Sequence, residues 1–163
     1  MINLIVMIVL SIVLNINYIG VRIMIDGDKL LKEVMYGIYY VETGREKGID
    51  PYKVIGPMTK VGYAIGKYQI MSSNVKDWTM KALGYAMSAE QFKNSPEAQE
   101  KTAAFIIGSY LKQYSPEDTA SMWFSGRPIK KAGNAKDAFG TSVPVYVRVF
   151  NVGRELFRKS IAE

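Results

Sequence analysis

The residues from Asp28 to Gly44, DKLLKEVMYGIYYVETG, carry a helical pattern that ends in a carboxylate. Leu31, Met35 and Ile38 recur at spacings of four and three, which is typical of one apolar helix face. Glu42 continues that face, four residues after Ile38. The pattern therefore predicts an amphipathic helix with an acid at the inner side of its last turn.

The helix is expected to end at Glu42, because Thr43 is a poor helix former and Gly44 suits a left-handed cap. Apolar surroundings and the negative end of the helix dipole both raise the pKa of a carboxylate at this place. A carboxylic acid that stays protonated near neutral pH can donate its proton to a leaving oxygen, as in acid-catalysed cleavage of glycosidic bonds. The alternative is that Glu42 pairs with one of the 21 Lys and Arg residues, or turns toward solvent.

The composition limits the size of the hydrophobic core and excludes several classes of catalytic site. With 163 residues, of which 48% are hydrophobic, the chain can bury one ordinary core. It has no cysteine and no histidine, which excludes Ser/His/Asp triads, Cys/His dyads and the usual zinc sites. The formal charge of +6 favours an anionic partner, such as nucleic acid, anionic lipid or a bacterial cell wall. Carboxylate, Lys, Tyr, Ser and Thr remain as candidate catalytic groups.

Residues 1–25 form a hydrophobic N-terminal segment that differs in composition from the rest of the chain. The run from Ile2 to Leu14 has the length of a secretory signal core, but no Lys or Arg precedes it and no A-x-A site follows. Residues 2–21 are also long enough to span a membrane, with Arg22 at the interface. The alternatives to a membrane-directed segment are a buried helix and an extension from a wrongly chosen start codon.

The remainder of the chain divides into expected helices and loops. Between Thr43 and Ile65 the sequence is rich in Gly, Pro and Lys without a sustained period, which predicts a long loop or small irregular lobe. The segment from Tyr63 to Met71 is compatible with a short strand or hairpin around Gly66. The serine-proline-glutamate runs at Ser95 and Ser115 are strong helix starts. The expected helices cover 28–41, 72–83 with Ser72 or Ser73 as cap, a short turn after Ser88, 96–114, 116–124 and 142–161, with a basic loop at 130–137.

Apolar spacing also predicts which helix faces point inward. In the helix over 72–83 the expected inner stripe is Val75, Trp78, Thr79 and Ala82. In the helix over 96–114 it is Ala98, Ala103, Phe105, Ile106, Ser109 and Tyr110. The last helix carries Val145, Val149, Val152 and Leu156 on one side, and its arginines elsewhere. We find no internal repeat, and we expect a mainly α protein.

Four short motifs follow one another along the chain: Glu42-Thr43-Gly44, Gly66-Lys67-Tyr68-Gln69-Ile70, Ala120-Ser121-Met122-Trp123-Phe124-Ser125-Gly126 and Tyr146-Val147. Their order and spacing resemble the lytic transglycosylases of the lysozyme-like type, which carry a catalytic Glu, a Gly-x-x-Gln-Ile type motif, an Ala-x-x-Tyr-Asn-x-Gly type motif and a late Tyr-Val. The resemblance covers residues 30–150. The residues of the second and third motifs are similar to those of transglycosylase domains in phage virion proteins.

The resemblance implies a lysozyme-like single domain over residues 26–163, mainly α with a small irregular or β loop lobe. It implies Glu42 as the catalytic acid and base, and it implies no cofactor and no metal. The residues implied to contact substrate are Thr43, Tyr68, Gln69, Ser125 and Tyr146, and the hydroxyl of Tyr146 is implied to contact either Glu42 or the substrate. Two of them depart from the family pattern, since Thr43 replaces the usual Ser and Ser125 stands where many relatives have Asn. Trp123 is a further candidate to stack on a sugar ring, although a core position is the expected role of such a residue.

The activity implied by the family is cleavage of the bond between N-acetylmuramic acid and N-acetylglucosamine in peptidoglycan, with a 1,6-anhydro product. One rival is a muramidase, in which Asp50 or a water completes hydrolysis of the same bond. The position of Asp50 before Pro51 is also typical of a turn residue. Another is a noncatalytic wall-binding or membrane-anchored protein. Nucleic-acid binding is disfavoured because the basic residues are scattered. We expect a monomer in a phage virion or in the bacterial cell envelope.

Overall fold

The computed structural model of the protein describes residues 26–163. The chain divides into two compact units, Met1–Lys32 and Glu33–Glu163. Apart from residues 26–32, the elements discussed below belong to the second unit. The expectations for residues 1–25, including a membrane-directed segment at 2–21, lie outside the described residues. Among the residues that are described, no helix is both long and apolar enough to cross a membrane.

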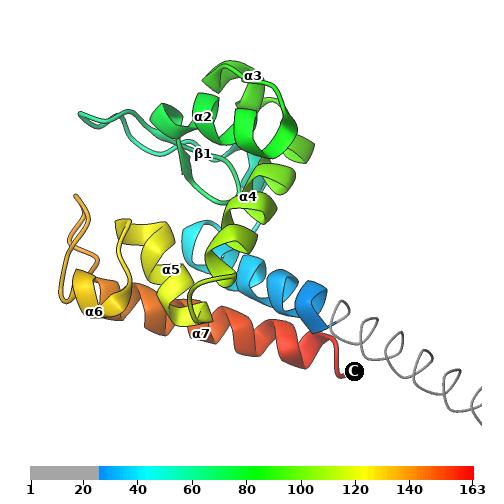
Figure 1. Ribbon diagram of the computed structural model, residues 1–163, viewed down its shortest axis with the longest axis vertical. Coiled ribbons are helices and arrows are strands. Elements are labelled where there is room, and N and C mark those ends of the chain that lie inside the picture. The colour runs from blue at the N-terminus through cyan, green and yellow to red at the C-terminus, as the bar shows by residue number, and fades with distance from the viewer. Residues whose placement is uncertain (1–25) are drawn as a thin grey trace, which may run out of the picture. The chain divides into compact units, whose positions relative to one another are not determined.

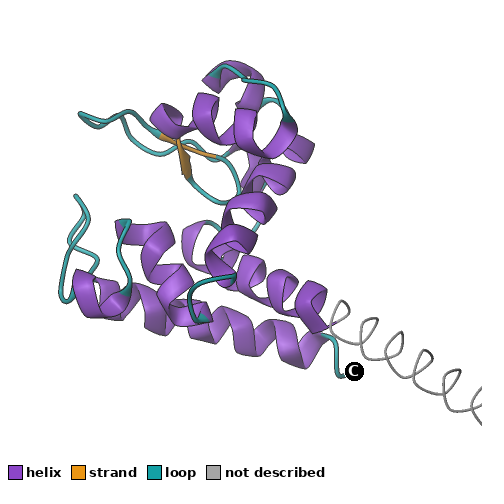
Figure 2. Ribbon diagram, in the orientation of Figure 1, coloured by secondary structure: helices purple, strands orange, loops and turns teal. Residues whose placement is uncertain are grey.

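The described chain is mainly helical, as expected, with one small two-stranded sheet (Figure 2). Residues 26–42 are helical, so this helix ends at Glu42 as predicted. The later helices are α2 (Ser72–Leu83), α3 (Ala89–Lys93), α4 (Pro96–Leu111), α5 (Pro116–Ser125), α6 (Ile129–Ala132) and α7 (Val143–Ser160), and a 3-10 turn η1 spans Pro51–Lys53. The strands are β1 (Ala64–Ile65) and β2 (Ile70–Met71).

Serine caps start three of the helices at the predicted places. Ser95 and Ser115 accept hydrogen bonds from the backbone N–H three residues later, and a proline follows each of them at the first helical position. Ser88 and Gln91 form a reciprocal capping box at the start of α3. Because each cap satisfies backbone donors that the helix itself leaves free, these starts are set by local sequence.

The two strands form an antiparallel hairpin whose loop, residues 66–69, holds most of the second motif. Ile65 pairs with Ile70, and both side chains are buried. Gly66 has a φ of 72°, which favours glycine, and a Cβ at this position would overlap the amide of Gln99. Gln99 is 1% exposed and its amide binds backbone of both the loop and η1, since it accepts from the N–H of Lys67 and donates to the carbonyl of Tyr52. The hairpin is thereby fixed to α4.

Within the second unit, α4 lies between two groups of elements (Figure 1). One group holds the hairpin, α2 and α3, and the other holds α5, α6 and α7 together with residues 33–42. Residues 33–42 cross α7 at two glycines. A Cβ on Gly37 would lie 2.7 Å from the ring of Phe150, and one on Gly153 would lie 2.7 Å from the Cβ of Tyr40. The crossing therefore needs glycine at both positions to bring the helices this close.

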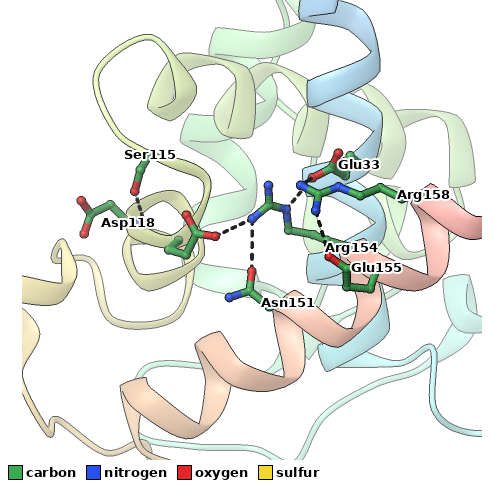
Figure 3. Close-up of polar contacts among 8 residues, drawn as sticks. Glu33, Ser115, Asp118, Asn151, Arg154, Glu155 and Arg158 are labelled. Carbon is green, nitrogen blue, oxygen red and sulfur yellow. Dashed lines mark hydrogen bonds and ion pairs between the residues drawn. The ribbon is translucent and has the colours of Figure 1, made fainter.

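A buried ion-pair network centred on Arg154 joins three helices of the second unit (Figure 3). Arg154 Nε donates to Oε1 of Glu33 at 2.6 Å, and its Nη1 donates to Glu117 at the start of α5. Arg158 also donates to Oε1 of Glu33, at 2.8 Å. Arg154 and Glu33 are only 8% and 6% exposed. Burial raises the pKa of Glu33, but the hydrogen bonds from Arg158 and Arg154 outweigh it and hold that pKa below its usual value.

Two of the predicted helix faces differ from the observed ones. Phe105 was expected in the core but is 48% exposed, because α4 buries the polar Gln99 and Thr102 on a face turned away from it. The apolar side of α7 is not its buried side. Val145, Val152 and Leu156 are 42%, 46% and 40% exposed, whereas the buried residues of this helix are Val143, Tyr146, Phe150, Gly153 and Arg154. Arg154 and Tyr146 can face inward because their polar groups bind Glu33 and Glu42.

Three local predictions also need correction. Neither Ser72 nor Ser73 caps α2, whose cap residue is Met71, and the hydroxyl of Ser72 accepts from the N–H of Tyr63 in the hairpin instead. The backbone of Gly44 is not left-handed, and its N–H donates to the carbonyl of Tyr39. The expected basic loop at 130–137 begins inside the short helix α6.

Candidate active site

Glu42 and Tyr146 form the centre of the candidate site. The hydroxyl of Tyr146 donates to Oε1 of Glu42 at 2.6 Å. Tyr146 is 2% exposed and its ring stacks on that of Phe124, with centroids 4.5 Å apart and an interplanar angle of 27°. Glu42 itself is half-buried at the end of its helix. Two of the four motifs therefore meet directly, and the third lies against them through Phe124.

The surroundings of Glu42 favour its protonated form. Burial raises the pKa of Glu42, the hydrogen bond from Tyr146 lowers it, the charge of Asp137 raises it and that of Arg45 lowers it, which gives a pKa of about 7. The helix-end position agrees with this direction, because the negative end of the helix dipole disfavours a carboxylate. Burial and the neighbouring Glu42 also raise the pKa of Tyr146 well above its usual value, so the phenol remains a hydrogen-bond donor.

Asp137 is a second carboxylate at this site, and sequence reasoning did not single it out. Its charge is close enough to raise the pKa of Glu42. It is held by its own loop, because its Oδ1 accepts from the backbone N–H groups of Phe139 at 2.9 Å and Thr141 at 2.8 Å. Asp50, the acid considered from the sequence, instead caps η1 by accepting from the N–H of Tyr52. The Asx turn formed by Asp137 is common in loops, so its sequence carries no specific signal.

Thr43 connects the acid to the hairpin loop. The hydroxyl of Thr43 donates to the carbonyl of Lys67 at 2.9 Å, and the residue is 6% exposed. The loop itself is tight, because Gln69 has a φ of 50°, a left-handed value that is uncommon outside glycine. The Gln69 amide nitrogen donates to the carbonyl of Gly66 at 2.8 Å. The first and second motifs are thus bound to each other, and the nitrogen of Gln69 is used inside the loop.

Lys67 lies in a cluster of tyrosines around Glu100, a residue of α4. Its Nζ is 2.7 Å from Oε1 of Glu100, which also accepts from the hydroxyl of Tyr52 at 2.6 Å. The other oxygen of Glu100 accepts from the hydroxyl of Tyr68 at 2.8 Å. Burial raises the pKa of Glu100, but the hydrogen bonds from these three residues outweigh it and lower the pKa. Lys67 also lies 5.0 Å from the ring centroid of Tyr39, one turn before Glu42.

The aromatic residues of the motifs are more enclosed than a sugar-stacking role suggests. Tyr68 is 3% exposed, and its hydroxyl is bound to Glu100, so its position is structural and its ring is not presented to a ligand. The indole nitrogen of Trp123 donates to the carbonyl of Tyr68 at 3.2 Å, and its ring lies 5.4 Å from that of Trp78. Trp123 nevertheless keeps partial exposure. The second and third motifs are therefore joined by the Trp123 hydrogen bond.

Ser125 lies in a pocket beside this centre. The pocket has a volume of about 360 Å³ and is lined by Phe124, Ser125, Arg127, Ala135, Lys136 and Asp137. The Ser125 hydroxyl donates to the carbonyl of Ser121 at 2.8 Å and lies at the end of α5, where Gly126 closes the helix with a φ of 71°. The pocket thus holds two basic side chains, one carboxylate and an aromatic ring that stacks on Tyr146.

Contacts made by Thr43, Tyr146 and Phe124 therefore bring parts of all four motifs together near Glu42. Within residues 26–163, no group of three His, Cys, Asp or Glu side chains is placed to hold a metal ion. Of the residues predicted from the sequence, Thr43 and Tyr146 lie at Glu42 and Ser125 lines the adjoining pocket. Gln69 is held inside the hairpin loop, and Tyr68 is bound to Glu100. Sequence reasoning missed Asp137, Glu100, Tyr52 and Phe124, whose roles depend on contacts between distant segments.

Comparison with protein-family models, with curated proteins and with solved structures finds no match to this chain. The assignment to a family thus depends on the four motifs and on the geometry at Glu42, and it is made below as a proposal.

Proposed function

We propose that this protein is a peptidoglycan lytic transglycosylase with a lysozyme-like catalytic domain in its second unit. The observation that carries the proposal is the partly exposed Glu42, with a pKa of about 7, held at 2.6 Å by the buried hydroxyl of Tyr146. An acid of this kind is poised to give up and regain a proton near neutral pH. Support comes from the hydrogen bond that Thr43 donates to the carbonyl of Lys67 in the loop of the Gly66–Ile70 motif.

In the proposed mechanism Glu42 acts first as acid and then as base. Its proton passes to the glycosidic oxygen between N-acetylmuramic acid and N-acetylglucosamine, and the bond from that oxygen to the muramyl anomeric carbon breaks. The muramyl N-acetyl oxygen assists by bonding to the anomeric carbon. The 6-hydroxyl of the same sugar then replaces it, losing its proton to the Glu42 carboxylate and closing the 1,6-anhydro ring. The acid is regenerated and no water is consumed.

The other site residues support this chemistry by position. Tyr146 donates to the carboxylate form of Glu42 and so stabilises the state that must take up the second proton. Ser125, Arg127 and Lys136 line the adjoining pocket, where an anionic substituent of the glycan would be attracted. In this proposal the glycan strands of the cell wall are the partner, which fits the formal charge of +6 and a place in the bacterial envelope or a phage virion.

A muramidase is the second candidate, and Asp137 is the observation that favours it. Hydrolysis with two carboxylates needs a base or nucleophile facing the acid. Asp137 influences the pKa of Glu42, whereas Asp50 is engaged as the cap of η1. Asp137 accepts two backbone hydrogen bonds in its own loop, which suits a fixed structural residue at least as well as a catalytic one. We therefore rank hydrolysis second.

The test is mass spectrometry of the soluble products released from purified peptidoglycan by the full-length chain in mild detergent. Glu42→Gln is the variant that removes the acid, and Glu46→Gln is its matched control on the neighbouring exposed turn. We expect 1,6-anhydromuramyl ends with the parent protein and with Glu46→Gln, and none with Glu42→Gln.

Other products identify the rival functions. Reducing muramic acid ends that depend on Glu42 would overturn the transglycosylase proposal in favour of a muramidase. A folded protein that sediments with peptidoglycan but releases nothing would reject both enzymes and leave a wall-binding module. Equal activity of Glu42→Gln and the parent protein would reject Glu42 as the catalytic acid.

A further inference from the structure

The outer face of α7 carries an apolar stripe that lies outside the core formed by residues 26–163. Val145, Val149, Val152 and Leu156 follow one another at spacings of four, three and four residues. Three of them are 40% exposed or more, and Val149 is half-buried. The core side of the same helix is formed by other residues, among them Tyr146, Phe150 and Gly153. This stripe therefore serves neither the core nor the candidate active site.

The spacing is that of a coiled-coil seam. Residues at alternating intervals of three and four form a narrow stripe that packs against a second helix of the same kind. In heptad terms Val149 and Leu156 occupy a positions, and Val145 and Val152 occupy d positions. An amphipathic helix that packs on a globular core has a wider apolar face, and α7 already has its core face on another side.

The charged residues beside the seam would pair with those of a second copy of α7 in the antiparallel orientation. Arg148 and Glu155 are the two residues at the g positions, and both are exposed. Glu155 also accepts from Arg158 of its own helix at 2.9 Å through Oε1, an exposed pair that contributes little. When two copies of α7 run antiparallel, Val145 lies opposite Leu156 and Val149 opposite Val152. The same register brings Arg148 of each copy next to Glu155 of the other, which gives two equivalent ion pairs about a two-fold axis. The opposite flank holds Tyr146 and Gly153, which face the copy's own core.

We propose that α7 is a homodimerisation surface on which a second copy of this chain binds antiparallel through its own Val145–Leu156 stripe. The seam spans three turns, so its area is below the ~800 Å² per partner of a standard interface, and the pair is weak and reversible. The proposal is independent of the proposed catalytic function, because Glu42 is not part of this surface.

The absence of cysteine in the chain allows a direct test by disulfide cross-linking of the full-length protein in mild detergent. Val145→Cys and Leu156→Cys are prepared as separate proteins, then oxidised alone and as a mixture. The two positions are eleven residues apart, so about 16 Å along the helix, and a disulfide needs Cα atoms within about 7 Å. Antiparallel pairing therefore links the two variants to each other but neither to itself. Met80→Cys, at a site 51% exposed on α2, is the control for random collision.

We expect the mixed disulfide to form at least several-fold faster than the Met80→Cys dimer, and mass spectrometry of the intact product identifies it. Arg148→Glu or Glu155→Arg in both proteins should reduce its rate several-fold, and the double exchange should restore it. Efficient self-linking of Val145→Cys would mean a parallel pair and overturn the antiparallel arrangement. Mixed cross-linking no faster than the Met80→Cys control would overturn the interface. Both cysteine sites are exposed, so the substitutions leave the fold intact.

Discussion

The hydroxyl of Tyr146 donates a 2.6 Å hydrogen bond to the carboxylate of Glu42, across 104 residues of chain. This hydrogen bond lowers the pKa of Glu42, whereas burial raises it. The bond stabilises the charged form of the acid, and the buried surroundings favour the neutral form. The bond also ties the end of the helix over residues 26–42 to α7. The pKa of Glu42, about 7, is therefore a balance that single substitutions should shift in a known direction.

Tyr146→Phe should raise the pKa of Glu42 above about 7, because the substitution removes the donor that lowers this pKa. The ring that stacks on Phe124 is kept, so the packing of α5 on α7 should persist. Nuclear magnetic resonance titration of the Glu42 carboxyl carbon measures the pKa without reference to activity. The alkaline limb of kcat/KM for peptidoglycan should move to higher pH by the same amount. An unchanged or lower pKa would contradict the role assigned to this hydrogen bond.

Asp137→Asn should lower the pKa of Glu42, because the charge of Asp137 raises it. The amide oxygen of Asn can still accept from the N–H groups of Phe139 and Thr141, so the loop should keep its shape. Asp77→Asn, on the exposed surface of α2, is the matched control and should leave this pKa unchanged.

Product analysis of the Asp137→Asn variant also separates the two enzyme candidates. A transglycosylase should continue to form 1,6-anhydro ends with Asn at position 137, with its alkaline limb at lower pH. A muramidase that uses Asp137 as base or nucleophile should lose its activity by orders of magnitude. Titration of the Glu42 carboxyl by nuclear magnetic resonance measures the effect of Asp137 on this pKa, whichever products are formed.

Glu42→Gln should change the pH dependence of stability. The pKa of Glu42 rises from 4.5 to about 7 on folding, so ionisation disfavours the folded state and stability falls as pH increases across this window. Ionisation of Glu42 lowers the free energy of unfolding by on the order of 3 kcal/mol above pH 7, at 1.36 kcal/mol for each unit of pKa. Urea unfolding at pH 5 and pH 8 should therefore show that Glu42→Gln gains stability relative to the parent chain at the higher pH. An equal difference at both values would reject the raised pKa.

Lys67→Met should destabilise the protein by about 1–3 kcal/mol, because it leaves the partly buried Glu100 without its cation. Lys81→Met is the matched control. The Lys81–Asp77 pair has the same 2.7 Å separation, but its side chains are 56% and 64% exposed against 20% and 34% for Lys67 and Glu100. Exposed pairs contribute little, so the control should unfold at nearly the parental urea concentration. Similar losses in both variants would contradict the importance of burial at Lys67.

The elements that sequence predicted well are those with local signals. The helix starts at Ser95 and Ser115 depend on residues within one turn. The helix over residues 26–42 does end at Glu42, but without the left-handed Gly44 cap on which that prediction was based. The inward position of Glu42 followed from spacing alone, because the stripe that contains Ile38 does face the core. Its contact with Tyr146 was available only through the family resemblance.

The features that sequence missed depend on contacts between distant segments. Tyr68 was expected to face a ligand, yet Glu100, 32 residues later, binds its hydroxyl and buries the ring. The apolar stripe of α7 did not reveal the buried face of this helix. That face is decided by Gly153 against Gly37 and by Arg154 against Glu33, and neither pairing leaves a periodic signal.

Glu33→Gln should remove an acid-sensitive contribution to the packing of α7. The pKa of Glu33 is lowered on folding, so the stabilisation is present above the unfolded value of 4.5 and is lost as pH falls through the folded value. Breaking the buried pair with Arg154 should cost about 3 kcal/mol or more at pH 7. Glu97→Gln is the control, because the Glu97–Lys101 pair also measures 2.6 Å but is exposed. Thermal unfolding at pH 7 and pH 3.5 should show a large loss for Glu33→Gln that shrinks at the lower pH, since the stabilisation from Glu33 decreases in the parent chain once the pH falls below 4.5. A loss of equal size at both pH values would instead mean that the Arg154 network acts through packing rather than charge.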